Sequence, residues 1–117
     1  MNLVIWALCV LVLWLTPQAA HAQGDIASVY SLKLCGGLTS SGEHLACGEL
    51  TAAHRTLPFG TRVRVTNKNN GRSVVVRIND RGPFVRHRII DLTPAVSHII
   101  GVAGLAPVEL EVVGRSP

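Results

Sequence analysis

Four polar residues in predicted loops and at strand ends carry side chains that could do chemistry. They are Glu43 in TSSGEH, His54 in TAAHRTLPFG, Asp80 in INDRGPF and Asp91 in RIIDLT. Functional residues concentrate in such connecting segments. Carboxylates and histidine are also the usual donors and acceptors of protons in catalysis. The set therefore indicates a candidate carboxylate site.

Each of these residues also has a plainer interpretation. Glu43 could be a solvated loop acid, and His54 a partly buried histidine with satisfied hydrogen bonds. Asp91 could pair with an arginine or cap the helix that follows it. Glu43, His54 and Asp80 are possible metal ligands by type, but no close pair such as HxxxH is present. We therefore expect neither a metal nor a cofactor.

Short strands separated by turn signals must position these residues. Alternating or β-branched stretches predict strands at 26–31, 61–67, 72–78, 88–92 and 107–113. The Asn-Gly pair within residues 68–71 predicts a hairpin turn. Thr93 as N-cap and Pro94 at the first position predict a helix that stops at Gly101. Many short strands with one small helix predict a compact β-barrel.

The first 22 residues are predicted to be a signal peptide. Residues 3–15 form an unbroken apolar run of 13 residues, and AHA offers a cleavage site at residues 20–22. The run is shorter than the roughly 20 residues that span a bilayer. Leu8 before Cys9 does not fit a lipobox, although the lack of Lys or Arg near Met1 leaves an uncleaved anchor open. We expect residues 23–117 to form one soluble, monomeric, periplasmic or secreted domain.

Charge and cysteine content favour an exported protein with an anionic partner. The net charge is +4, and ten of the eleven basic residues lie between Lys33 and Arg88. Cell-wall polymer fits such a surface, whereas export argues against nucleic acid. Cys35 and Cys47 are expected to form a disulfide that contributes about 3 kcal/mol, with unpaired thiols as the alternative.

The stretches TAAH…LPFGT, VRINDRGPF and RIIDL closely resemble the double-psi β-barrel domain of the rare lipoprotein A family, from about residue 27 to 113. The resemblance implies a mainly β, six-stranded barrel with one or two short helices. It also implies a lytic transglycosylase that cleaves peptidoglycan glycan strands, preferably those stripped of peptides. The catalytic residues that it implies are Asp80, Glu43 and His54.

These residue types suit glycosidic bond cleavage. A carboxylic acid with a raised pKa protonates the leaving oxygen and can then act as base. We expect Asp80 to do both, Glu43 to bind or stabilise the distorted sugar, and His54 to orient the site. Arg81 should lower the Asp80 pKa unless its side chain faces away. The further residues expected to bind substrate are Tyr30, Arg77, Arg81 and Asp91.

Departures from the family pattern leave other functions open. The usual Trp-Tyr-Gly is Val29-Tyr30-Ser31 here, and Leu45 replaces an aromatic. No lipobox and no peptidoglycan-binding repeat is found in the sequence. One alternative is an expansin-like module that binds polysaccharide without cutting it. A second is a hydrolase that uses Glu43 and Asp80 as a carboxylate pair. A third is a secreted effector or inhibitor that uses the barrel for protein contacts.

Overall fold

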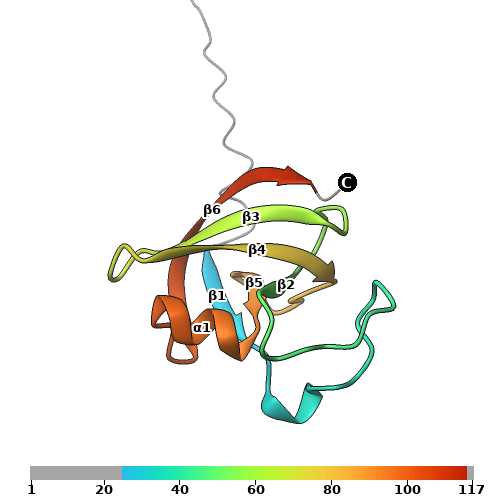
Figure 1. Ribbon diagram of the computed structural model, residues 1–117. Helices are drawn as coiled ribbons and strands as arrows, with labels where there is room; N and C mark the ends of the chain where they lie inside the picture. The colour runs from blue at the N-terminus through green and yellow to red at the C-terminus, as the bar shows by residue number, and fades with distance from the viewer. Residues whose placement is uncertain (1–24, 116–117) are drawn as a thin grey trace, which may run out of the picture.

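The computed structural model describes residues 25–115, which form a closed six-stranded barrel with one α-helix and one short 3₁₀ helix (Figure 1). The predicted signal peptide, residues 1–22, lies outside the described residues. The strands are β1 Ile26–Val29, β2 Thr51–His54, β3 Thr61–Asn67, β4 Ser73–Asp80, β5 Arg88–Leu92 and β6 Leu105–Arg115. The helices are α1 Pro94–Ile100 and the 3₁₀ helix Leu32–Leu34. The predicted fold class is confirmed.

The strands follow one another around the barrel in the order β1-β5-β2-β4-β3-β6. The pairs β1–β5 and β2–β4 are parallel, and the other four pairs are antiparallel. Alternation along β3 follows the sequence pattern, because Val63 and Val65 are fully buried whereas Arg62 and Arg64 are exposed. Each strand therefore presents one apolar face to the interior, and polar residues are left for the outside and the ends.

Helix α1 has the boundaries that its caps predict. The Thr93 hydroxyl accepts a hydrogen bond from the Val96 N–H at 3.4 Å, and Gly101 ends the helix at φ +73°. Val96 and Ile100 are fully buried, so the helix covers the barrel through one apolar face.

Three strand boundaries differ from the prediction. Strand β1 ends at Val29, so Tyr30 and Ser31 belong to the connection that leads to the 3₁₀ helix. Strand β4 continues to Asp80, because its parallel pairing with β2 extends to the Ala53–Asp80 pair. Strand β6 is longer than predicted because it pairs with both β1 and β3. Asp80 is therefore the last residue of a strand and not a loop residue.

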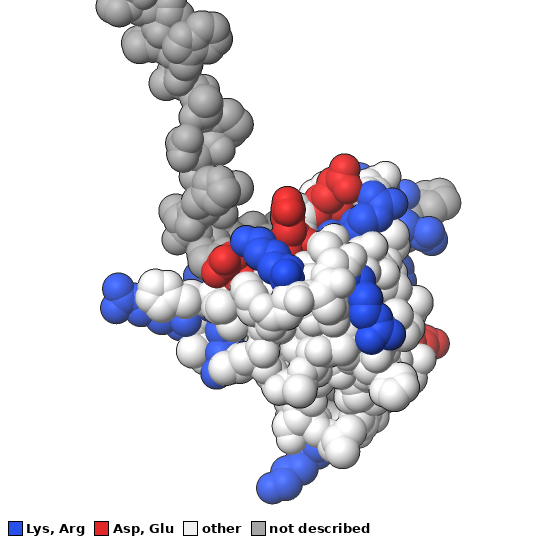
Figure 2. All heavy atoms as spheres, turned by 90° about the vertical axis from the view of Figure 1, so that its left-hand side faces the viewer, with Lys and Arg blue, Asp and Glu red and all other residues white. Residues whose placement is uncertain are grey.

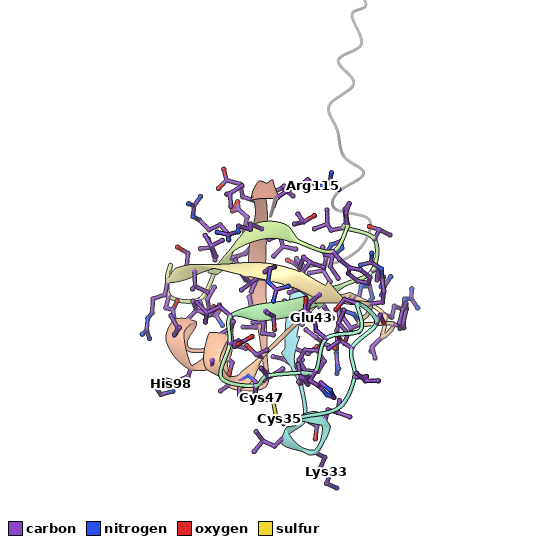
Figure 3. All side chains as sticks on the ribbon, turned by 45° about the vertical axis from the view of Figure 1, so that its right-hand side comes forward. Lys33, Cys35, Glu43, Cys47, His98 and Arg115 are labelled. Atoms are coloured by element: carbon purple, nitrogen blue, oxygen red, sulfur yellow. A yellow bond between two sulfur atoms is a disulfide. The ribbon has the colours of Figure 1, made fainter. Side chains whose placement is uncertain are left out.

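The glycine-rich connection between β1 and β2 is closed by the predicted disulfide. Cys35 and Cys47 are joined, with their Cα atoms 5.7 Å apart (Figure 3). The prediction of a disulfide is therefore confirmed. In residues 25–115 no helix has the length and apolar character needed to cross a membrane.

Candidate active site

A hollow of about 360 Å³ lies beside the end of β4. Its lining includes Tyr30, Leu34, Asp80, Arg81, Phe84 and Asp91. We call it the Asp80 hollow. It combines acidic and hydroxyl groups with apolar side chains, and its volume is within the roughly 300–1,000 Å³ of small-molecule sites. Three of the four residues predicted to bind substrate, namely Tyr30, Arg81 and Asp91, line it together with Asp80.

Three hydrogen bonds hold the Asp80 carboxylate. Tyr30 Oη donates to Oδ2 at 2.6 Å, and the backbone N–H groups of Ser40 and Arg81 donate to Oδ1 at 2.8 and 2.9 Å. Burial raises the pKa of Asp80, but these donors together outweigh it and hold the pKa below its usual value. The pKa of Asp80 in the unliganded protein is therefore lowered, because the hydrogen bonds favour the carboxylate.

Tyr30 is kept as a hydrogen-bond donor by its surroundings. Burial raises its pKa well above the ordinary value, and the neighbouring negative charges of Asp80 and Asp91 raise it further. Its hydroxyl therefore stays protonated and directed at Asp80 throughout the physiological pH range. Tyr30 can orient the carboxylate, but it is a very weak acid in this environment.

The guanidinium of Arg81 points away from the Asp80 carboxylate. Its Nη1 donates to the backbone oxygens of His54 at 3.2 Å and Leu57 at 2.8 Å. The same group lies 4.1 Å from the ring centroid of Phe59, which is a cation–π distance. Arg81 thus lowers the Asp80 pKa through its backbone N–H, while its side chain supports the turn between β2 and β3.

Glu43 lies beside the hollow and not in its lining. Arg77 donates to both Glu43 oxygens at 2.7 and 2.9 Å, and Asn79 Nδ2 donates at 3.3 Å. The hydrogen bonds from Arg77 hold the pKa of Glu43 below its usual value. Glu43 is labelled near the end of β4 in Figure 3. Its loop also reaches the hollow, because the Ser40 N–H binds Asp80 and the Ser41 N–H donates to Asn79 O.

His54 is a buried histidine whose ring accepts hydrogen bonds. Its Nδ1 accepts from the backbone N–H groups of Thr56 at 3.2 Å and Leu57 at 3.1 Å, so the neutral ring carries its proton on Nε2. Burial lowers the pKa of His54, and the charges of Arg81 and Arg55 lower it further. The ring is not in the lining of the Asp80 hollow, and it holds the turn that follows β2.

Asp91 lines the hollow and accepts a short hydrogen bond from Ser28 Oγ. Neither plainer interpretation of Asp91 holds. Thr93 itself caps α1, and among residues 25–115 Asp91 forms no ion pair. Its position on β5 beside β1 places a second carboxylate in the same hollow as Asp80.

The three predicted catalytic residues are linked but do not share one cavity. Asp80 lines the hollow, Glu43 is joined to it through Asn79 and the loop containing Ser40, and the His54 carbonyl receives the Arg81 side chain. Residues that the sequence did not single out complete the site: Ser28, Ser40, Arg55, Asn79 and Phe84. The contacts of Ser28, Ser40 and Arg55 cross long sequence separations that no local pattern reveals, whereas Asn79 and Phe84 lie in the same motif as Asp80.

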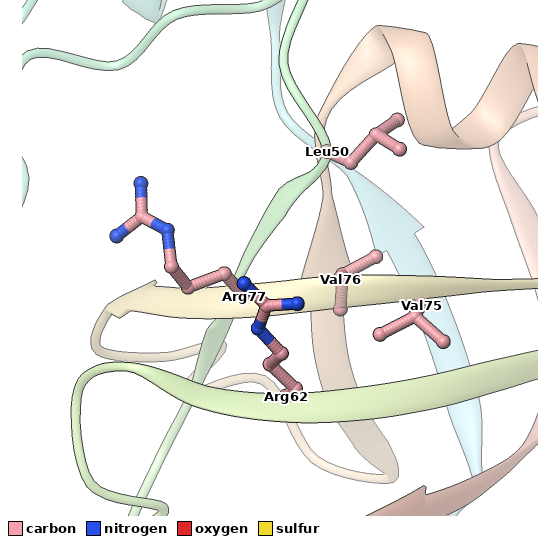
Figure 4. A pocket seen from close by; sticks show the side chains of 5 residues that line it. All are labelled: Leu50, Arg62, Val75, Val76 and Arg77. Atoms are coloured by element: carbon pink, nitrogen blue, oxygen red, sulfur yellow. The ribbon is translucent and has the colours of Figure 1, made fainter. Parts of the chain in front are cut away.

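A second hollow of about 230 Å³ lies on the outer face of β3 and β4, where Leu50, Arg62 and Arg77 surround it (Figure 4). Arg62 and Arg77 are opposite each other in the β3–β4 register. Their guanidinium groups extend to the same side of the sheet.

Among residues 25–115, no three His, Cys, Asp or Glu side chains gather in a way that could hold a metal ion.

The closed six-stranded barrel with two parallel strand pairs and a carboxylate at a strand end defines a protein of the double-psi β-barrel class. A family model described as lytic transglycolase matches residues 22–110. The chain belongs to this family.

Similar proteins share the domain at high identity. The chain is 56% identical over 94 residues to the probable endolytic peptidoglycan transglycosylase RlpA of Nostoc sp., covering 77% of this chain and 25% of the relative. It is 56% identical over 91 residues to the endolytic peptidoglycan transglycosylase RlpA of Campylobacter jejuni, covering 76% and 33%. With the Vibrio cholerae protein of the same name it shares 54% over 89 residues, covering 74% and 34%. The chain thus spans about a third or less of the length of these relatives.

Proposed function

We propose that the protein is an endolytic lytic transglycosylase that cleaves peptidoglycan glycan strands to 1,6-anhydro-muramyl products. The observation that carries this proposal is the Asp80 carboxylate, which three hydrogen bonds aim into an open hollow of ligand size. Family membership and the names of the relatives support the choice of substrate and reaction. We expect a preference for strands that have lost their peptides.

The reaction needs one group that gives a proton and then takes one. The acid form of Asp80 donates to the glycosidic oxygen as the bond from C1 to that oxygen breaks. The resulting carboxylate then takes the proton of the C6 hydroxyl on the sugar that carries C1. The C6 oxygen bonds to C1 and closes the anhydro ring. Asp80 is protonated again at the end, and no water is consumed.

The lowered pKa of Asp80 makes the acid step depend on bound glycan. In the unliganded protein the carboxylate is ionised. A glycan over the hollow removes water, and burial without water favours the neutral acid. Glu43 and Arg77 then hold the glycan beside the hollow, while His54 supports the turn that carries Arg81.

The protein acts outside the cytoplasm in this proposal, as a monomer in the periplasm or after secretion. Names of the relatives that refer to peptidoglycan support this location, and the predicted signal peptide agrees with it. A hydrolase that uses Glu43 and Asp80 as a carboxylate pair is less well supported, because Arg77 engages both Glu43 oxygens and Glu43 does not line the hollow with Asp80. An expansin-like binding module is the main alternative that an experiment must separate.

The test is digestion of purified peptidoglycan, intact and amidase-stripped, by the wild type and the Asp80→Asn variant. We expect anhydro-muramyl ends by mass spectrometry, and a loss of at least about 100-fold in the variant because the proton carrier is gone. Asp25→Asn is the matched control, since Asp25 is an exposed carboxylate paired with Lys68. Reducing ends would indicate a hydrolase. Binding to the wall without cleavage would contradict the proposal and favour a binding module.

A further inference from the structure

Phe84 is the most exposed Phe, Tyr or Trp side chain in residues 25–115. The described residues contain three aromatic side chains, Tyr30, Phe59 and Phe84. The Tyr30 hydroxyl binds Asp80, and the Phe59 ring lies against the Arg81 guanidinium. Phe84 lines the Asp80 hollow while 78% of its surface remains exposed. An exposed large aromatic side chain beside a polar site is typical of a binding contact.

The ring of Phe84 rests on the backbone of its own loop. A methyl group placed on Gly82 would lie 3.5 Å from Phe84 Cε2, so one side of the ring packs over Gly82. Gly82 has φ +117°, a conformation that glycine adopts far more readily than other residues. The remaining surface of the ring is open to solvent and to a ligand in the hollow.

Arg55 fixes the loop that carries Phe84. Its Nε donates to Pro83 O at 2.6 Å, and its Nη2 donates to Val85 O at 3.1 Å and Arg88 O at 3.4 Å. Two of these acceptors flank Phe84 in the sequence. The ring is therefore held on a backbone that is already positioned, which reduces the entropy lost when a ligand binds.

A second apolar side chain of the lining comes from the other loop. Leu34 lines the same hollow, is 54% exposed, and precedes Cys35 of the disulfide. The lining also includes Val29, Pro83 and Val85, and its polar groups include the hydroxyl of Tyr30 and the carboxylates of Asp80 and Asp91. Apolar contacts combined with hydrogen-bonding groups match a pyranose ring, whose faces carry C–H groups and whose edge carries hydroxyls.

We infer that Phe84 is a stacking platform for one pyranose ring of the glycan strand at the Asp80 hollow, with Leu34 as a second apolar contact. This inference rests on the proposed function for the identity of the glycan. Phe84 contacts the substrate and places the sugar beside Asp80, while Arg55 positions Phe84. It accounts for sugar binding in a chain whose other two described aromatic rings are already engaged.

The test measures binding and turnover separately, with peptide-free glycan oligosaccharides prepared from peptidoglycan. Binding is measured by calorimetry in the Asp80→Asn background, so that the ligand is not consumed. Phe84→Ala should weaken binding about tenfold or more, because a large apolar contact is lost. In the active protein, Phe84→Ala should raise KM by a similar factor and change kcat much less.

Substitutions of graded shape separate stacking from simple apolar contact. Phe84→Tyr and Phe84→Trp keep a flat ring and should bind within about threefold of the wild type, whereas Phe84→Leu should resemble Phe84→Ala. Val112→Ala removes an apolar side chain that is 56% exposed and outside the hollow, and it should change nothing. Thermal unfolding of each variant checks that the fold is intact.

The outcomes distinguish this inference from the proposed function. If the wild type cleaves glycan and Phe84→Ala binds and cleaves as the wild type does, or if Phe84→Leu restores full binding, the platform is refuted while the enzyme stands. If the wild type cleaves nothing but binding still requires an aromatic residue at position 84, the platform stands and the lytic activity fails. Absence of both binding and cleavage in the wild type refutes both.

Discussion

The Asp80 carboxylate is tuned by hydrogen bonds more than by neighbouring charges. Asp80 is partly buried, which alone would raise its pKa, yet Tyr30 and two backbone N–H groups lower it. In the proposed mechanism, Asp80 is therefore a carboxylate until substrate binds. This arrangement orients the group precisely without leaving a reactive acid in the empty hollow.

His54 gives the protein a pH-dependent stability. Its pKa in the folded state is below the unfolded value of 6.5. Above pH 6.5 the ring is neutral in both states, and the full stability is present. Below pH 6.5 His54 binds a proton in the unfolded chain but not in the folded chain. The free energy of unfolding therefore decreases as the pH falls, by at most about 1.4 kcal/mol per pH unit.

Urea unfolding of the wild type at pH 7.5, 6.5 and 5.5 measures this effect. We expect His54→Gln to be less stable at pH 7.5 but to lose less on acidification, because glutamine does not titrate. His98→Gln is the matched control, since His98 is exposed on α1. An equal loss of stability in the wild type and in His54→Gln would contradict this account.

The residue types and motifs predicted the candidate carboxylates but not their surroundings. Asp80 and Asp91, which the motifs single out, line one hollow. The partner of Asp91, Ser28, is 63 residues away in sequence, and Arg55 reaches carbonyls 28 to 33 residues away. Such partners depend on the closure of the barrel, which no local pattern encodes.

At the scale of elements, the connection between β1 and β2 matters most to the site. It supplies the Ser40 N–H to Asp80, Glu43 to Arg77, and Leu34 to the hollow. Its residues are rich in glycine and largely exposed, so few apolar contacts hold it in place. The Cys35–Cys47 disulfide therefore restrains this segment together with the hydrogen bonds of Ser40 and Glu43 to β4.

Removal of the disulfide should weaken both stability and the site. We expect the Cys35→Ala, Cys47→Ala double variant to lose about 3 kcal/mol of unfolding free energy, because the unfolded chain regains the entropy of a loop of about 12 residues. Glycan binding should weaken as well, since Ser40 and Leu34 lose their fixed positions. Urea unfolding and calorimetry measure the two effects, and wild type under reducing conditions should match the variant.

Element boundaries were predictable where local signals were strong. The caps at Thr93 and Gly101 defined α1, and alternation defined β3. The end of β4 was misplaced because Gly82-Pro83 marks a turn, while the strand pairing that extends β4 to Asp80 comes from β2, which is distant in sequence. Turn residues in the sequence mark the last position to which a strand can extend. The pairing with a neighbouring strand determines how close to that position the strand continues.

At the scale of the whole molecule, the face drawn in Figure 2 carries its basic side chains at separate positions and not in one patch. The eleven basic and seven acidic residues of the chain all lie in residues 25–115. Figure 2 shows acidic side chains gathered at the upper edge of one face, with basic side chains at separate positions around it. In the proposed function, the net positive charge attracts an anionic polymer, and contacts in the Asp80 hollow select the bond that is cut.

The order of the strands sets the moment at which the protein can fold. Strand β1 lies between β5 and β6. The first strand to be synthesised can therefore pair with its neighbours only after the last two strands have been made. Strand β6 also completes the edge of β3. We expect a chain that ends at residue 104 to show no cooperative unfolding by circular dichroism, because β1 and β3 each lack a neighbour. A nascent chain therefore stays open until its final strand is released, the state in which a polypeptide can be threaded through a narrow translocation channel.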